Sequence, residues 1–284
     1  MKVGHQYLTT PSNPFPVELA EITLREYSDL LSDSAKVYEF IYYERRIEEI
    51  KMNINAFFDA KKYYTDLYER SFLEKIDHDY KEEAFIEFNR CLINFIASFK
   101  SFVEHCENRT KTIFGSTSEE LVEFKSHLSN LFDNNFSYRF FIKLRDYAIH
   151  VGYPIENVLF SQYTFNPSNT DCWYEVQTLG SKDKLSSSNT FNAKIREEIS
   201  NEEDPFDLSL FIHDVYNLIL NVFKKFTSIA SREFANPANR LIVISQKYNQ
   251  ESLSVTISKL ESGRIKFYSK LLPIALAKRI IDNC

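Results

Sequence analysis

Residues 139–155 read RFFIKLRDYAIHVGYPI, and this stretch contains both a helix and its end. Apolar residues recur every three or four positions over residues 137–151, which is the spacing of an amphipathic helix. Gly152 and Pro154 follow directly, and both residue types commonly end a helix. The stretch therefore predicts a helix whose last turns carry an Arg and a His separated by four residues.

Four further stretches have the spacing of amphipathic helices and contain neither Gly nor Pro. They cover residues 35–69, 81–112, 119–133 and 207–231. Ser118 precedes the third of them and is a good N-cap residue, because its hydroxyl can accept a hydrogen bond from the first turn. Long helices of this kind predict a mainly α protein.

The pattern changes after Asn236-Pro237. The segments 241–248, 253–260 and 264–271 alternate or run apolar, which predicts a three-stranded antiparallel β-meander. Pro273 then begins a short basic helix that reaches the end of the chain. The fold class predicted from these patterns is mainly α, a helical bundle with a small C-terminal antiparallel β-meander.

The same patterns divide the chain into three parts. The first is an N-terminal segment, 1–34, and the second is a helical domain, 35–235. A polar, loop-rich insertion at 156–206 lies inside that domain and contains a predicted strand at 173–179. The third part, 236–284, holds the meander and the basic helix.

Composition excludes several functional classes. The chain of 284 residues has only five Gly, and it contains neither of the common Gly-rich phosphate-binding motifs. No His pair, Cys cluster or nucleophile motif has the spacing of a metal or hydrolase site, so we expect neither metal nor cofactor. No apolar run reaches the ~18–20 residues that span a bilayer. Four Cys without close pairing predict reduced thiols and a cytoplasmic location.

Charge is distributed unevenly around a net value of −6. Residues 1–88 contain eleven Lys and Arg against eighteen Asp and Glu. Residues 240–284 contain eight against three. An acidic chain with local basic patches is compatible with binding RNA in one cleft and disfavours coating of nucleic acid without specificity.

The helix at 137–151 brings together Arg145, Asp146 and His150. A guanidinium is always charged and can grip two phosphate oxygens, and an imidazole can take or give a proton near neutral pH. Asp146 lies one turn before His150, so it can accept a hydrogen bond from the ring. Arg145 lies about 140° around the helix from His150. The pair thus forms two flanks that a twofold copy of the helix could complete around one phosphate.

Five other residues are candidate RNA contacts. Arg139 and Lys143 lie before Arg145 on the same helix and are placed to hold neighbouring phosphates. Tyr147 is a candidate on that helix as well. Asn94 and Ser98 belong to a polar stripe on the helix at 81–112. A solvated basic face explains Arg139 and Lys143 equally simply, and a solvent-facing stripe explains Asn94 and Ser98 more simply than RNA contacts do.

The catalytic interpretation of the trio also has a structural alternative. A His near the C-terminal end of a helix is favoured by the helix dipole, and Asp146 and His150 can be an ordinary helix pair. Arg145 can be a surface salt-bridge donor. The spacing alone leaves both interpretations open.

Two stretches together resemble the HEPN superfamily of helical-bundle proteins. They are residues 88–99, which begin Phe-Asn-Arg, and residues 138–154, which contain Arg145-Asp-Tyr-Ala-Ile-His150. The family signature is an Arg, a polar residue, a short gap and a His, and Asp146 occupies the polar position. The resemblance covers roughly residues 35–235, and only the 139–154 stretch is specific.

The resemblance implies a metal-independent endoribonuclease whose motifs from two subunits face each other across one cleft. It implies cleavage of RNA to a 2′,3′-cyclic phosphate and a 5′-hydroxyl, and the setting of a toxin or an anti-phage defence effector. Some members are catalytically silent binding modules. One toxin subgroup has a Tyr two residues after the His, and this chain has Gly152 there and Tyr153 one place later.

We therefore expect RNA as substrate, a homodimer, and an antitoxin or defence-system protein as a further partner, with no membrane association. The rival hypothesis is a non-catalytic helical interaction module or a regulatory subunit of such a system. The basic C-terminal region fits an RNA grip, a dimer support or a docking surface. Its residues to test are Lys266, Lys270, Lys278 and Arg279.

Overall fold

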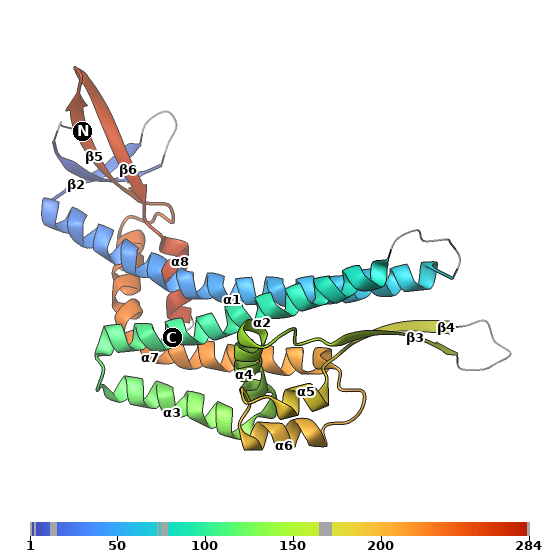
Figure 1. The fold of residues 1–284 in the computed structure, drawn as a ribbon. Coiled ribbons are helices and arrows are strands. Elements are labelled where there is room, and N and C mark those ends of the chain that lie inside the picture. Colours follow the sequence, from blue (N-terminus) through green and yellow to red (C-terminus); the bar gives the residue numbers. More distant parts are fainter. Residues whose placement is uncertain are drawn as a thin grey trace. The chain divides into compact units, whose positions relative to one another are not determined.

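The computed structural model describes residues 2, 4–11, 16–72, 74, 79–164 and 172–282, apart from the side chain of residue 232. Helices make up most of the described chain, and the strands form two antiparallel sheets (Figure 1). The predicted fold class, mainly α with a small β part, is confirmed. Contacts divide the chain into two compact units. We call residues 46–225 the central unit, and residues 1–45 with 226–284 the terminal unit.

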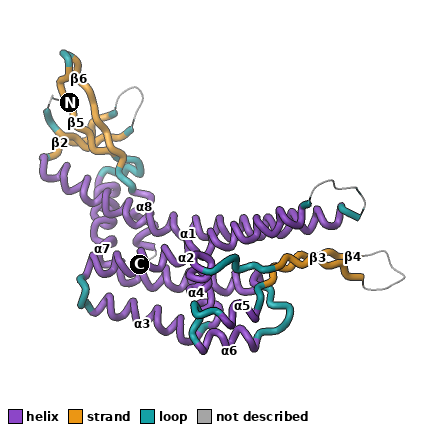
Figure 2. The backbone as a smooth tube through the Cα atoms, viewed as in Figure 1, coloured by secondary structure: helices purple, strands orange, loops and turns teal. Residues whose placement is uncertain are grey.

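The central unit is built from helices and one hairpin (Figure 2). Its helices are the part of α1 (Leu24–Arg70) from residue 46, α2 (Tyr80–Phe114), α3 (Glu119–Asn134), α4 (Phe136–His150), α5 (Lys182–Ser187), α6 (Ala193–Asn201), the 3₁₀ turn η1 (Leu208–Phe211) and the part of α7 (Ile212–Lys247) to residue 225. The hairpin pairs β3 (Asn157–Thr164) with β4 (Cys172–Leu179). Each helix predicted in this region is present.

The apolar stripe of α2 forms the middle of the central unit. Phe88, Phe95, Phe99 and Phe102 are each 0% exposed. Burial of a Phe side chain contributes roughly 1.5–3 kcal/mol, so this stripe is a main source of stability. The ring of Phe99 contacts that of Tyr138 on α4, with centroids 5.5 Å apart. The stripe thereby fixes α4, the helix that carries the Arg–His pair.

Helix ends in this unit follow the sequence signals. Ser118 caps α3, because its hydroxyl accepts a hydrogen bond from the backbone N–H of Leu121 at 3.2 Å. At the end of α4, the N–H groups of Val151 and Gly152 both donate to the carbonyl of Tyr147, at 2.8 and 3.2 Å. The predicted cap and the predicted stop are both confirmed.

The terminal unit contains a four-stranded antiparallel sheet in the order β2-β1-β5-β6. The strands are β1 (Gln6–Thr10), β2 (Val17–Ile22), β5 (Ser254–Glu261) and β6 (Arg264–Leu271). The first part of α1, the last part of α7 and the short helix α8 (Ile274–Asp282) complete the unit. The predicted strands at 253–260 and 264–271 and the helix after Pro273 are confirmed.

The predicted strand at 241–248 is wrong, because α7 continues without interruption to Lys247. Ala238, Leu241 and Ser245 are buried, and their spacing of three and four residues is that of one helix face. Pro237 lies inside the helix and does not end it. The sheet therefore takes its other two strands from the N-terminus, so segments 1–34 and 236–284 belong to one unit rather than two.

The described residues of the segment 156–206, which are 156–164 and 172–206, contain more regular structure than the predicted loop-rich insertion. It holds the β3–β4 hairpin, whose second strand confirms the strand predicted at 173–179, and the helices α5 and α6. Within the described residues, none of the helices combines the length and the apolar character needed to cross a membrane.

Candidate functional site

Helix α4 has one face buried and one face that reaches the surface. Phe140, Phe141 and Leu144 are each 0% exposed and anchor the buried face. Arg145 and Asp146 are half-buried, and His150 is exposed at the last helical position. The periodicity of the helix thus separates packing residues from the residues available for chemistry.

Three cations surround the carboxylate of Asp146. The Lys100 ammonium of α2 lies 2.9 Å from Oδ1, and the Arg145 guanidinium lies 3.3 Å from the same atom. The Lys143 ammonium is 3.8 Å from Oδ2. One carboxylate cannot neutralise three cations, so this cluster keeps a net positive charge, and a phosphate group would complement it.

The pKa of the Asp146 carboxyl reflects two opposing effects. Partial burial raises the pKa by disfavouring the charged form, and the hydrogen bond and charge of Lys100 lower it, with smaller contributions from Arg145 and Lys143. The cations prevail, and the pKa lies below its ordinary value. Asp146 is therefore an ionised structural partner of the cations at neutral pH.

His150 stands apart from this cluster. Among the described residues, its imidazole forms no hydrogen bond and no ion pair, although it lies one helical turn from Asp146. The expectation that Asp146 orients the imidazole is corrected, because Lys100 and Arg145 occupy the carboxylate instead. The exposed ring keeps both nitrogens available for proton transfer.

Arg139 is a structural residue, which corrects its prediction as an RNA contact. Its side chain is buried and forms a two-pronged ion pair with Glu198 of α6, with Nε 2.6 Å from Oε2. Its Nη1 donates to the carbonyls of Phe132 and Asp133, at 3.1 and 3.3 Å. The guanidinium thus ties α4 to α6 and to the end of α3, and each of its three nitrogens donates a hydrogen bond.

The polar stripe of α2 faces α1 over part of its length. The Ser98 hydroxyl is buried, donates to the carbonyl of Phe95 at 2.9 Å and accepts from Asn53 of α1 at 3.0 Å. Ser98 is therefore a helix-packing residue, which corrects the expected RNA contact. Asn94 is exposed, and its side chain remains accessible to a ligand. Asn94 therefore stays a predicted RNA contact, and Ser98 does not.

Tyr147 is 6% exposed and stacks on Phe191, with ring centroids 5.9 Å apart. It also lines a cavity of about 560 Å³ that begins directly after His150. Its other lining residues come from the loop after α4 and from α5: Val151, Gly152, Tyr153, Ile155, Glu156, Lys184, Ser187 and Ser188, with Phe85 of α2. Burial limits Tyr147 to shaping this cavity, and a cavity of this volume can hold a small ligand.

Asn89 fixes the loop that lines this cavity. Its amide Nδ2 donates to the carbonyl of Ile155, and its Oδ1 accepts from the N–H of Ile155, both at 3.1 Å. Asn89 is 1% exposed and Ile155 is 0% exposed. No role for Asn89 was predicted, although an Asn between Phe88 and Leu92 on an apolar helix face is a recognisable signal of a buried polar contact.

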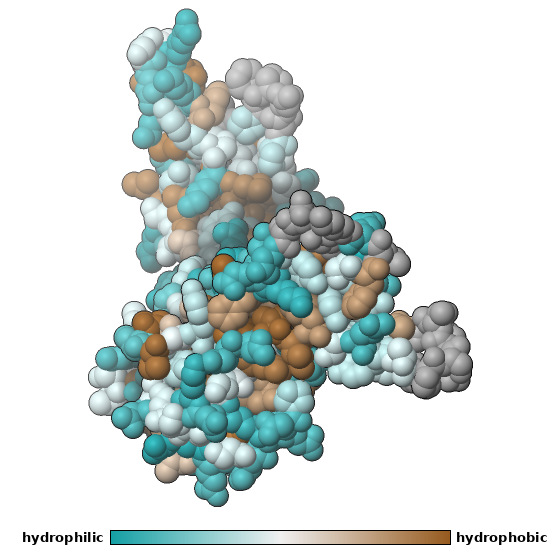
Figure 3. Space-filling view, turned by 45° about the vertical axis from the view of Figure 1, so that its right-hand side comes forward, coloured by the Kyte–Doolittle hydropathy of each residue, from teal (hydrophilic) through white to brown (hydrophobic). Residues whose placement is uncertain are grey.

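Exposed apolar side chains flank His150. Ile149, Val151 and Tyr153 are 51%, 58% and 57% exposed. Apolar, brown side chains also gather among hydrophilic, teal ones on the one face of the molecule that Figure 3 draws, where no residue is labelled. Apolar groups that remain exposed beside a candidate catalytic residue are typical of a surface that a partner covers.

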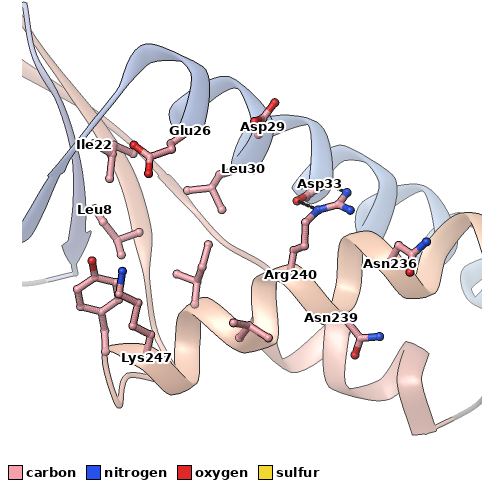
Figure 4. A pocket seen from close by; sticks show the side chains of 13 residues that line it. Leu8, Ile22, Glu26, Asp29, Leu30, Asp33, Asn236, Asn239, Arg240 and Lys247 are labelled. Carbon is pink, nitrogen blue, oxygen red and sulfur yellow. Dashed lines mark hydrogen bonds and ion pairs between the residues drawn. The ribbon is translucent and has the colours of Figure 1, made fainter.

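The terminal unit has a separate pocket of about 470 Å³ between the first part of α1 and the last part of α7 (Figure 4). Leu8, Ile22 and Leu30 form its apolar wall, and Lys247 lies at one end. Arg240 lies toward the other end and is held by Asp33, with Nε 2.8 Å from Oδ2. Glu26 and Asp29 also line the pocket, so with Asp33 its two cations face three carboxylates.

No group of three or more His, Cys, Asp and Glu side chains placed to hold a metal ion occurs in the described part of the chain. The chain matches no protein-family model, and neither the curated proteins nor the solved structures contain a match.

Proposed function

We propose that the protein is a metal-independent endoribonuclease of HEPN type, in which Arg145 and His150 act at a cleft completed by a second copy of the chain. The observation that carries the proposal is the exposed His150 imidazole, unpartnered among the described residues, on the same helix as a cluster of excess cations. A transferable proton and a phosphate-binding cation are the two requirements of RNA cleavage by internal transfer.

The reaction needs few groups. The ribose 2′-hydroxyl loses its proton and attacks the adjacent phosphorus, and the bond to the 5′-oxygen breaks as that oxygen receives a proton. The products are a 2′,3′-cyclic phosphate and a 5′-hydroxyl. Arg145, with Lys143 and Lys100 nearby, stabilises the charge that develops on the phosphorane-like transition state. His150 transfers one of the protons, and the His150 of a second copy transfers the other.

A second copy of the chain is proposed for two reasons. Arg145 and His150 lie on different flanks of α4, so one helix does not surround a phosphate. Ile149, Val151 and Tyr153 expose apolar surface around His150, which association of two copies would bury. The setting that we propose is a toxin or an anti-phage effector, restrained or triggered by a protein partner.

The rival function is a non-catalytic interaction module, such as a regulatory subunit of a defence or toxin–antitoxin system. The same exposed apolar residues favour it, because they suit a protein partner of any kind. In that case the cation cluster around Asp146 serves only to join α2 to α4 through Lys100. The two functions differ in whether His150 is needed for a chemical step.

The decisive experiment incubates purified protein with RNA in the presence of EDTA. We expect Arg145→Ala and His150→Ala each to reduce cleavage by at least about 100-fold, the usual contribution of general acid–base or charge stabilisation. Arg70→Ala and His105→Ala are matched controls, because they remove the same residue types from other helices of the central unit. The wild-type fragments should end in a cyclic phosphate.

The result has clear alternatives. Equal cleavage by wild type and His150→Ala would overturn the assigned chemistry. A wild-type protein that degrades no RNA, either in vitro or after induction in cells, would favour the interaction module. Sedimentation of the same samples measures the dimer, and a Tyr153→Arg variant should weaken both dimerisation and cleavage if the apolar surface joins the two copies.

A further inference from the structure

The β5–β6 hairpin of the terminal unit gathers cations on one of its two faces. The register pairs Lys259 with Lys266, Val255 with Lys270, and Glu261 with Arg264, and paired residues of antiparallel strands point to the same side. Alternation along β6 adds Tyr268 to that side. We call this surface the cation face: Lys259, Arg264, Lys266, Lys270, Glu261 and Tyr268.

The charges on the cation face are not balanced. Glu261 is 2.9 Å from the Lys266 ammonium and accepts a hydrogen bond from the Tyr268 hydroxyl at 2.7 Å. Lys259 lies over the Tyr268 ring, 5.6 Å from its centroid. Among the described residues, Arg264 and Lys270 form no ion pair. Four cations therefore share a single carboxylate.

This arrangement is unfavourable in the free protein. Lys259 and Lys266 are directly opposite each other, and like charges in that position destabilise a sheet. Lysines on an edge strand can prevent edge-to-edge aggregation, and β6 is an edge strand. Lys259 belongs to β5 and lies just beyond the stretch, Ser254–Ile257, that pairs with β1. Protection of the edge needs a charge on the outer strand, but it does not need a second lysine directly opposite that charge.

We propose that the cation face binds single-stranded RNA along its sugar-phosphate backbone. Residues two apart on a strand are separated by about 6.6 Å, so Arg264, Lys266 and Lys270 present charges at intervals that a polyanion can follow. Tyr268 is 44% exposed and offers a ring on which a base can stack. An exposed sheet with cations and an aromatic is a recurring platform for single strands.

The cations of α8 do not belong to this surface. Lys278 is 2.9 Å from Glu251, and Arg279 pairs with Glu44, so both are neutralised by acidic partners within the terminal unit. The choice of RNA over other polyanions rests on the proposed ribonuclease function. Binding by the cation face does not require that function.

The test measures binding of a fluorescent single-stranded RNA of about 12 nucleotides, long enough to cover one such face. All proteins carry His150→Ala, so that cleavage cannot obscure binding. The test variant combines Lys259→Gln, Arg264→Gln and Lys270→Gln. The matched control, Arg25→Gln with Lys51→Gln and Lys62→Gln, removes the same charge from exposed positions on α1. Circular dichroism confirms that each variant is folded.

We expect the test variant to bind RNA more weakly and the control to bind like the parent. The slope of log affinity against log salt should fall by about 2, since each cation contributes roughly 0.7 for a single strand. Tyr268→Ala should cost about tenfold in affinity. Equal losses in test and control variants would overturn the assignment to this face. Equal binding of polyglutamate or anionic vesicles would overturn the assignment to RNA.

The outcomes also separate this inference from the proposed function. The triple substitution can also be placed in the wild-type background, where cleavage can be measured. If neither RNA binding nor cleavage changes, the cation face is refuted and the ribonuclease function is not. Binding that depends on the cation face in a protein that never cleaves RNA would refute the ribonuclease and leave an RNA-binding protein.

Discussion

The side chain of Asn89 forms a pair of hydrogen bonds, both 3.1 Å long, with the backbone N–H and carbonyl of Ile155. A side-chain amide offers a donor and an acceptor, as a peptide group does. Asn89 of α2 therefore bonds both backbone groups of Ile155, as a residue of a paired strand would. The loop after α4 is thereby fixed next to the helix end that carries His150. The loop that follows His150 is thus held by Asn89, which lies 66 positions before Ile155 in the chain.

Asn89→Ala should destabilise the protein by about 2–3 kcal/mol, because the backbone groups of Ile155 would be buried without partners. Urea unfolding followed by fluorescence measures the loss. Asn94→Ala, an exposed Asn of the same helix, should change the free energy of unfolding by less than about 0.5 kcal/mol. Equal midpoints for wild type and Asn89→Ala would show that the two hydrogen bonds contribute little.

Arg139→Ala should lower the free energy of unfolding by about 2–3 kcal/mol, because it leaves Glu198 and two carbonyl groups without their donor. Lys143→Ala, one turn along the same helix, should leave stability nearly unchanged and weaken RNA binding. Thermal unfolding and RNA binding measured on both variants distinguish the two residues. A stable Arg139→Ala protein with reduced RNA affinity would restore Arg139 as an RNA contact.

Asp146 should contribute to stability only above acidic pH. Its pKa is lower in the folded protein than the ordinary value of 3.8, although burial opposes the shift, because Lys100 and Arg145 stabilise the carboxylate. The contribution is therefore fully present above pH 3.8 and is lost as the pH falls through the lower folded pKa. Asp146→Asn should cost up to about 1 kcal/mol at pH 7, and the difference should shrink as the pH falls through the folded pKa. A difference that is the same at pH 7 and pH 3 would contradict this.

Two of the thiols should be unreactive in the folded protein. Burial raises the pKa of Cys91 to about 11 and that of Cys106 well above its ordinary value, so neither forms a thiolate at neutral pH. Cys172 is half-buried and free. In a Cys284→Ser background, Ellman's reagent should therefore react quickly with one thiol, that of Cys172. The thiols of Cys91 and Cys106 should react only after urea unfolds the protein. A fast reaction that survives Cys172→Ser would indicate that α2 opens locally.

Much of the helical architecture could be predicted because its signals are local. The apolar stripe of α2, the Ser118 cap and the Gly152 stop depend on residues within a few positions of each other. The strand predicted at 241–248 failed because its β-branched residues fit either structure, and Pro237 resembled a terminator. The N-terminal strands escaped prediction because β1 is short and has three consecutive buried residues rather than alternating ones.

The candidate site could be predicted only in part, because roles on one helix depend on distant partners. Arg139 and Lys143 have the same sign of charge, and only the fold brings Glu198 to the first of them. Helical spacing permits Asp146 to bind His150, but Lys100 from α2 offers a charged donor at 2.9 Å. Competition of this kind has no local signature in the sequence.

The cation face should affect how strongly the protein is retained on charged chromatography resins. Retention then depends on where the charges lie as well as on the net charge. The pI of about 5.6 predicts that the chain is anionic at neutral pH and passes through a cation exchanger. A sulfated polysaccharide on a resin, however, binds one surface of the protein rather than its net charge. The strands β5 and β6 present four cations and one carboxylate on the same side. The native protein should therefore be retained on heparin at low salt, while the urea-unfolded chain, in which these residues are dispersed, should flow through.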